Sequence, residues 1–95
     1  MANLNAALQH IKRTRNRQGP VRSDRFDEYR HEYEGILRAT EMLGGDPAVD
    51  ELIGWMIDET EANRRLPRPA GVRERARRIC RDRGASIPRD SPLRT

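Results

Sequence analysis

Arginines recur at a fixed spacing near the carboxyl end of this 95-residue chain, where they could bind phosphate. Arg73, Arg77 and Arg81 stand four residues apart, so they form one row along a helix, with Arg78 beside it. Such a row of guanidinium groups matches a major groove or a track of phosphates. Because residues 70–83 lack the amide and hydroxyl side chains that read base edges, the pattern predicts phosphate binding with little sequence specificity.

A second basic stretch, residues 12–17 (KRTRNR), could reach an adjacent groove. The candidate nucleic-acid-binding residues are therefore Lys12, Arg13, Arg15, Arg17, Arg73, Arg77, Arg78 and Arg81. A basic arm, a helical core and an arginine-rich last helix resemble in outline the layout of three-helix DNA-binding domains. The homeodomain signature of the last helix is absent, so no family is assigned.

Trp55 is the only tryptophan and has two interpretations. It fills the core between two helices, or it anchors a partner protein, since tryptophan is enriched at interface hot spots. The small residues Ala48 and Gly54 leave room for either arrangement. The second interpretation makes Trp55 the candidate partner-binding residue of a protein–protein adaptor whose acidic middle helices form the contact surface.

No catalytic constellation is visible in the sequence. Ser86 and Ser91 lack a nucleophile-elbow motif, and His10 and His31 with Cys80 make no metal-ligand spacing. We expect Cys80 to be a small buried hydrophobe, as free cysteines usually are. The sequence therefore predicts no enzyme activity, no cofactor and no metal site.

Charge is divided sharply along the chain. Residues 1–22 carry +5, residues 23–63 carry −9 and residues 64–95 carry +8. The basic ends either fold back on the acidic middle, in pairs of about 0–1 kcal/mol each, or face an external polyanion. They could also pair with the acidic middle of a second copy, which would give a homodimer.

Several classes are excluded by composition. No apolar run approaches the roughly 20 residues of a membrane span, and the first residues contain no apolar stretch typical of a signal peptide. A single cysteine rules out an intramolecular disulfide framework. We therefore expect a cytoplasmic protein without a membrane partner.

Hydrophobic residues recur with helical spacing, and no alternating strand pattern is present. The predicted helices are residues 4–17, 24–43, 47–63 and 70–83. Their apolar faces comprise Leu4, Ala7, Leu8 and Ile11; Phe26, Tyr29, Tyr33, Ile36, Leu37, Thr40 and Leu43; Val49, Leu52, Ile53, Met56, Ile57 and Thr60; and Val72, Ala76, Ile79 and Cys80.

The ends of these helices are marked by residues with defined roles. Gly44-Gly45 is predicted to stop one helix, since glycine takes the left-handed conformation without steric cost. Asp46 and Pro47 are residue types typical of a helix start, and they mark the start of the next helix. Gly84 is expected to end the last helix. The proline-containing linker 64–71 separates the last two helices, and its Leu66 is expected to contact the core.

Together these patterns predict an all-α fold, a small three- to four-helix bundle. Its parts are a basic N-terminal helix or arm (1–22), a helical core domain (23–84) and a disordered, proline-containing tail (85–95). The predicted function is a small non-enzymatic nucleic-acid-binding or regulatory protein, with DNA or RNA as partner. The alternative is the adaptor, or an accessory protein of a virus or mobile element, with a protein partner.

Overall fold

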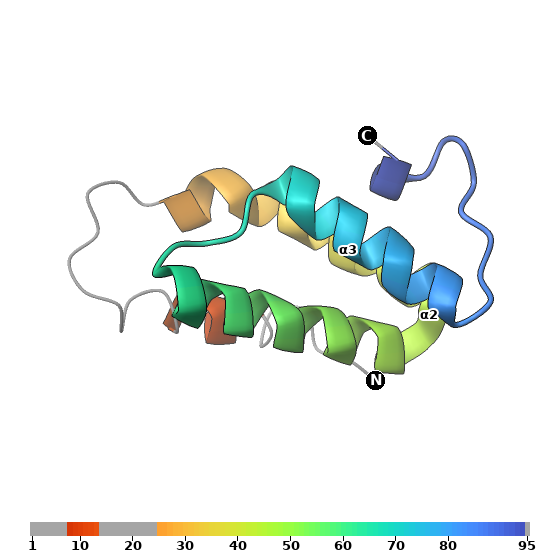
Figure 1. Cartoon of the computed structure of the whole chain (residues 1–95). Helices are drawn as coiled ribbons and strands as arrows, with labels where there is room; N and C mark the ends of the chain where they lie inside the picture. Colours follow the sequence, from red (N-terminus) through yellow and green to blue (C-terminus); the bar gives the residue numbers. More distant parts are fainter. Residues whose placement is uncertain (1–7, 14–24, 95) are drawn as a thin grey trace.

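The computed structural model describes residues 8–13 and 25–94, except for the side chains of residues 25–27. The regular elements within these stretches are all helical: a short helical segment at 8–13, α2 (Arg25–Asn63), α3 (Pro69–Asp82) and the 3₁₀-helix η1 (Pro92–Arg94) (Figure 1). The all-α prediction is confirmed for this part of the chain. Of the predicted helix 4–17, the ends lie outside the described residues.

Helix α2 is broken near its middle. Gly45 has φ 78° and ψ −177°, which is outside the helical region and accessible mainly to glycine. Asp46 and Pro47 follow at once, and the fixed φ of proline suits the first turn of a new helix. The chain therefore forms a first segment (25–44) and a second segment (46–63), close to the two helices predicted on either side of Gly44-Gly45.

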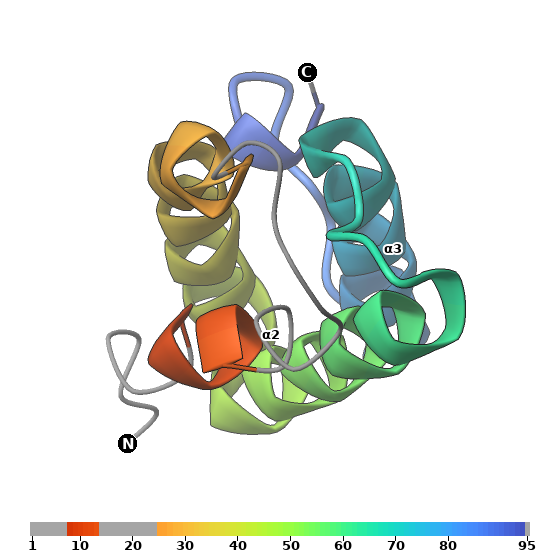
Figure 2. The same ribbon diagram turned by 90° about the vertical axis from the view of Figure 1, so that its left-hand side faces the viewer.

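The two segments of α2 run in opposite directions, and α3 lies alongside them (Figure 1). Viewed end-on in Figure 2, α3 lies on one side of the second segment, and residues 8–13 lie on the other side, against both segments of α2. The basic N-terminal stretch and the basic last helix are therefore separated by α2. Each packs an apolar face toward the same interior.

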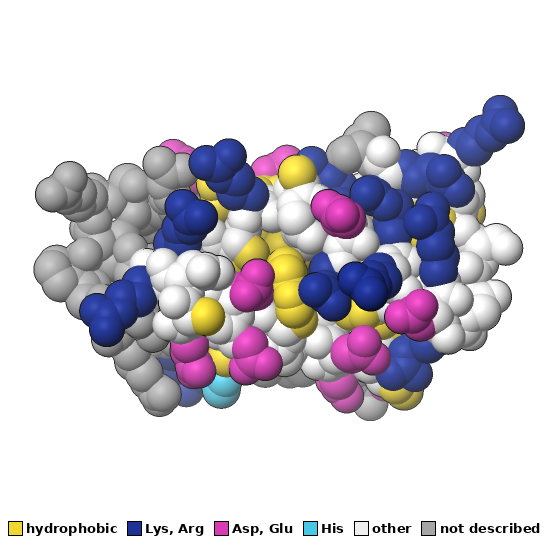
Figure 3. Space-filling view, in the orientation of Figure 1, with side chains coloured by type: hydrophobic (Ala, Val, Ile, Leu, Met, Phe, Trp, Pro, Cys, Tyr) yellow, Lys and Arg dark blue, Asp and Glu magenta, His cyan; other side chains and the backbone are white. Residues whose placement is uncertain are grey.

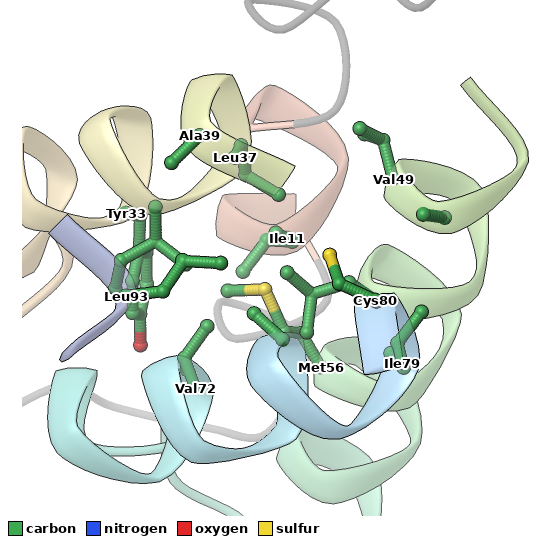
Figure 4. Close-up of a cluster of buried hydrophobic side chains, with 14 of the residues drawn as sticks. Ile11, Tyr33, Leu37, Ala39, Val49, Met56, Val72, Ile79, Cys80 and Leu93 are labelled. Carbon is green, nitrogen blue, oxygen red and sulfur yellow. The ribbon is translucent and has the colours of Figure 1, made fainter. Parts of the chain in front are cut away.

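One hydrophobic cluster joins all of these elements. Figure 4 shows Ile11, Leu37, Met56, Val72 and Cys80 converging at its centre, and each is no more than 1 % exposed. The prediction that Cys80 is buried is confirmed. Burial also raises the pKa of the Cys80 thiol, although Arg83 acts in the opposite sense. The thiol is therefore held neutral and unreactive.

Two threonines lie inside this apolar interior, and each has a hydrogen-bond partner. The hydroxyl of Thr40 donates to the carbonyl of Ile36, and that of Thr60 to the carbonyl of Met56, each at 2.7 Å. Among the side chains that the structure describes, no buried nitrogen or oxygen lacks a partner. The described side chains of the interior therefore carry no polar atom whose desolvation is uncompensated.

Gly44 lies where the end of the first segment meets the end of α3. A Cβ at this position would stand 2.6 Å from the Cβ of Ala48 and 3.5 Å from the Sγ of Cys80. The Cβ of Ala48 is fixed to the backbone of the same turn and cannot move aside, whereas 3.5 Å to the thiol is an ordinary contact distance. The absence of a side chain at Gly44 therefore allows the tight turn of α2 beside the end of α3.

The end of α3 is closed by a Schellman motif. Gly84 has φ 87°, its N–H donates to the carbonyl of Arg81, and the N–H of Ala85 donates to that of Cys80, both at 2.9 Å. Ile87 then returns to the core, where it is 6 % exposed. The predicted glycine stop at the end of this helix is confirmed.

The tail after α3 differs from the disordered segment that we predicted. Leu93, in η1, is fully buried, and the guanidinium of Arg77 donates to its carbonyl. The guanidinium of Arg94 donates to the carbonyl of Ile87 at 2.7 Å. Two buried apolar side chains and the hydrogen bonds of two arginines to carbonyl oxygens hold residues 87–94 in place. The burial of Leu93 and the bond from Arg77 are tertiary contacts that the local sequence does not encode.

The linker between α2 and α3 is also tied to the core. Leu66 is 5 % exposed, as predicted, and the hydroxyl of Tyr33 donates to the carbonyl of Pro67. Burial, followed by the nearby charges of Tyr29 and Glu32, raises the pKa of Tyr33 far above its ordinary value. Tyr33 is therefore neutral and acts as a buried hydrogen-bond donor.

The contact at Gly44 predicts opposite outcomes for two glycine substitutions. Gly44→Ala should destabilise the fold by about 1–3 kcal/mol, because the added methyl clashes with Ala48. Gly54→Ala is the matched control: nothing lies within 4 Å of its added Cβ, so it should stabilise the helix by about 0.5–1 kcal/mol. Chemical denaturation followed by circular dichroism measures the stability of both variants. Equal effects would contradict the close approach of Gly44 to Ala48.

The raised pKa of Tyr33 predicts that the fold loses stability in alkaline solution. Its folded-state pKa lies above the unfolded value of about 10, so its contribution is complete below pH 10 and declines as the pH rises further. Tyr33→Phe should cost about 0.5–1.5 kcal/mol at neutral pH, through the lost hydrogen bond to Pro67. The variant should also lose less unfolding free energy than the parent as the pH rises above 10, by up to about 1.4 kcal/mol per pH unit. An unchanged alkaline slope in denaturation curves would show that Tyr33 does not cause it.

Candidate nucleic-acid interface

The predicted arginine row of α3 is divided between the interior and the surface. The Nη1 of Arg73 lies 3.7 Å from Oε1 of Glu32 on the first segment of α2, and the Arg73 side chain is only 20 % exposed. Arg77 donates to the carbonyl of Leu93 in η1. These two arginines therefore connect α3 to its neighbours and are half-buried.

Arg78 and Arg81 are exposed on α3. With Glu74 and Asp82 they line a hollow of about 340 Å³, which the side chain of Arg77 also borders. Charges of both signs meet there, with the arginines in excess. An external phosphate can thus approach chiefly Arg81 of the row and Arg78 beside it.

Trp55 lies in the seam between the second segment of α2 and α3, where it is half-buried. The guanidinium carbon of Arg75 lies 5.1 Å from the centroid of its ring, within cation–π range. Trp55 packs against the core and also reaches the surface. The first interpretation, core packing, is therefore observed, and the second, contact with a partner protein, stays a prediction.

Three hollows follow α3 in series. The largest, about 400 Å³, shares Trp55 and Gly71 with a second of about 230 Å³. The second shares Glu74 and Arg78 with the hollow at Arg81. We call this surface the α3 track. Its charged and aromatic lining residues are Tyr29, Trp55, Glu59, Arg65, Arg68, Glu74, Arg75, Arg77, Arg78, Arg81 and Asp82.

The charge along the track is predominantly positive, with six arginines and three acids in its lining. Figure 3 shows the same face: basic side chains gather over the carboxyl half of α3 and acidic ones follow the second segment of α2. Hydrophobic surface emerges between them. The face therefore offers cations beside an apolar strip.

The predicted residues of the N-terminal stretch do not join this track. Lys12 is half-buried and Arg13 exposed, and the Nε of Arg13 donates to the carbonyl of Gln9 at 3.5 Å. Their helical segment lies across α2 from α3 (Figure 2). Arg15 and Arg17 lie outside the described residues. The structure thus separates Lys12 and Arg13 from Arg78 and Arg81.

Three arginines of the track were missed as site residues by the sequence analysis. Arg65 and Arg68 are exposed in the linker before α3, and Arg75 covers Trp55. The linker's basic composition was visible in the sequence, but its course past Trp55 was not. Tyr29 was assigned to the apolar face of its helix, and it is half-buried in the largest hollow.

The described residues form neither a metal site nor a membrane span. No group of three or more His, Cys, Asp and Glu side chains among the described residues could hold a metal ion. None of the helices described has the length and apolar character needed to cross a membrane. His10 and His31 are both exposed.

Comparison with protein-family models, with curated proteins and with solved structures found no match. The function is therefore argued from the geometry of the α3 track.

The divided row predicts different roles for neighbouring arginines. Arg77→Ala removes the donor to the Leu93 carbonyl and should destabilise the fold by about 1–2 kcal/mol. Arg78→Ala is the matched control on the exposed side of the same helix and should change stability by less than about 0.5 kcal/mol. Urea denaturation distinguishes them. Equal stability of the two variants would mean that Arg77 does not anchor the tail.

Proposed function

We propose that this protein is a small nucleic-acid-binding protein, with a binding or regulatory role, whose contact surface is the α3 track. The proposal rests chiefly on one observation: exposed arginines line a continuous surface along α3, with Arg65 and Arg68 at one end and Arg78 and Arg81 at the other. Arginine binds phosphate through several donors in a fixed fork, and it remains charged at any physiological pH.

The distribution of acids supports the orientation of such a complex. The stretch 23–63 carries the net charge −9, and its acidic side chains border the track on the second segment of α2. These carboxylates repel phosphate, so a polyanion is directed toward α3 and away from α2. Asn63 is the only amide side chain in the described lining of the track, and contacts mainly to phosphate imply low sequence specificity.

The salt dependence of nucleic-acid affinity tests this proposal when two exposed arginines are replaced. Replacing both Arg78 and Arg81 by Ala should weaken binding and reduce the slope of log K against log salt by about 0.9 per arginine on duplex DNA. The loss should be similar for unrelated sequences. Arg73 and Arg77 are left intact because their replacement also disturbs the fold. Fluorescence anisotropy with labelled DNA and RNA at several salt concentrations measures the slope.

The control is the double replacement of Arg30 and Arg38 by Ala. Both arginines are exposed on the first segment of α2 and lie outside the lining of the α3 track, so the variant loses the same charge elsewhere on the protein. It should keep the parental slope. Equal effects of the two double variants would show that only net charge matters. Absence of salt-dependent binding by the parent would reject the proposal and favour the adaptor, for which Trp55 would be the contact to replace.

A further inference from the structure

Trp55 and its surroundings define the form of nucleic acid that the α3 track suits. Base–aromatic stacking beside a positively charged groove is the common means of binding single strands, because every base has a flat face to stack. Trp55 stands where the first two hollows of the series meet, and Tyr29 also lines the largest. Two aromatic side chains therefore face one basic track.

We infer that the α3 track binds single-stranded nucleic acid, with an unpaired base stacked at Trp55. This inference rests on the proposed function and adds the form of the ligand. The hollow of about 400 Å³ is within the usual size of small-ligand pockets, so it is large enough to receive a flat ring. Bases of an intact duplex are stacked inside the helix, and only an unpaired base can enter the hollow.

The arginines around Trp55 fit this arrangement. Arg75 lies over the ring at 5.1 Å, and a planar guanidinium is itself a surface on which bases stack. Arg68 lies in the hollow on one side of Trp55 and Arg78 in the hollow on the other. A strand that crosses the seam at Trp55 thus meets a cation before and after the stacked base.

Two acids constrain where the strand lies. Glu59 lines the largest hollow and Glu74 the second, and each repels a nearby phosphate. Phosphates are therefore directed to the arginines that line the same hollows, and the base is directed to the aromatic rings. A phosphate beside Glu59 or Glu74 would place like charges together.

Trp55 also supplies the measurement, because it is the only tryptophan in the chain. Addition of oligothymidylate to the unaltered protein should quench its fluorescence and bind more tightly than a duplex of equal length at the same salt concentration. An oligouridylate probe should behave similarly, since stacking does not require the 2′-hydroxyl. Equal affinity for single strand and duplex without quenching would overturn the stacking inference and leave the proposed function standing.

Two variants at this position separate stacking from folding. Trp55→Leu removes the aromatic face and should weaken binding of the labelled single strand roughly 5- to 150-fold, the range that corresponds to one stacked base. Trp55→Phe keeps an aromatic face and should retain most of the affinity. Circular dichroism at the assay temperature establishes that both are folded. Parental affinity in a folded Trp55→Leu protein would overturn the inference.

The variants distinguish a failure of the proposed function from a failure of the stacking inference. The Arg78→Ala and Arg81→Ala double variant should lose affinity for both single strand and duplex, whereas Trp55→Leu should affect the single strand alone. No salt-dependent binding of either probe would reject the proposed function and this inference together. Salt-dependent binding that tolerates Trp55→Leu would reject the inference only.

Discussion

The tight turn of α2 at Gly44 is the constraint on which the rest of the fold depends. A Cβ at Gly44 would stand 2.6 Å from the Cβ of Ala48, so the turn would have to open, whereas the Sγ of Cys80 at the end of α3, at 3.5 Å, lies at ordinary contact distance. Arg83 spans the same junction, with its Nη2 3.1 Å from Oε1 of Glu51, although this ion pair is exposed and contributes little. From this end, α3 packs along the second segment of α2, and Trp55 lies in the seam between these two helices.

The course of α3 also explains why its arginines differ in role. Residues four apart on a helix are rotated by about 40° from one another, so a row of three turns through about 80°. Arg73 faces Glu32 and Arg77 faces the tail, whereas Arg81 has rotated into solvent. One regular spacing in the sequence therefore supplies two contacts within the protein and one exposed cation. Arg78, beside the row, adds the second exposed cation.

Local signals in the sequence were sufficient to predict the helices but not their contacts. Gly45 and Gly84 adopt positive φ, and the helices end near these residues, because the cost of that conformation is set within one or two residues. The burial of Cys80 follows from helical phase alone. The order of the tail depends on Leu93 meeting a core built from α2 and α3, and on a donor from Arg77. The track likewise depends on which side of Trp55 the linker passes, and no periodicity encodes that path.

Of the interpretations of the charge partition, the structure shows one in part, the folding of a basic end onto the acidic middle. Glu32 and Glu51 of α2 pair with Arg73 and Arg83 of α3, so part of the basic end does fold back on the acidic middle. These pairs are partly exposed, and salt screens them, whereas the hydrophobic cluster that joins the same helices does not depend on charge. Salt should therefore weaken a phosphate complex on the outer face of α3 much more than it weakens the fold. Affinity measured over a range of salt concentrations then reports on the exposed arginines, because the helix that carries them stays in place.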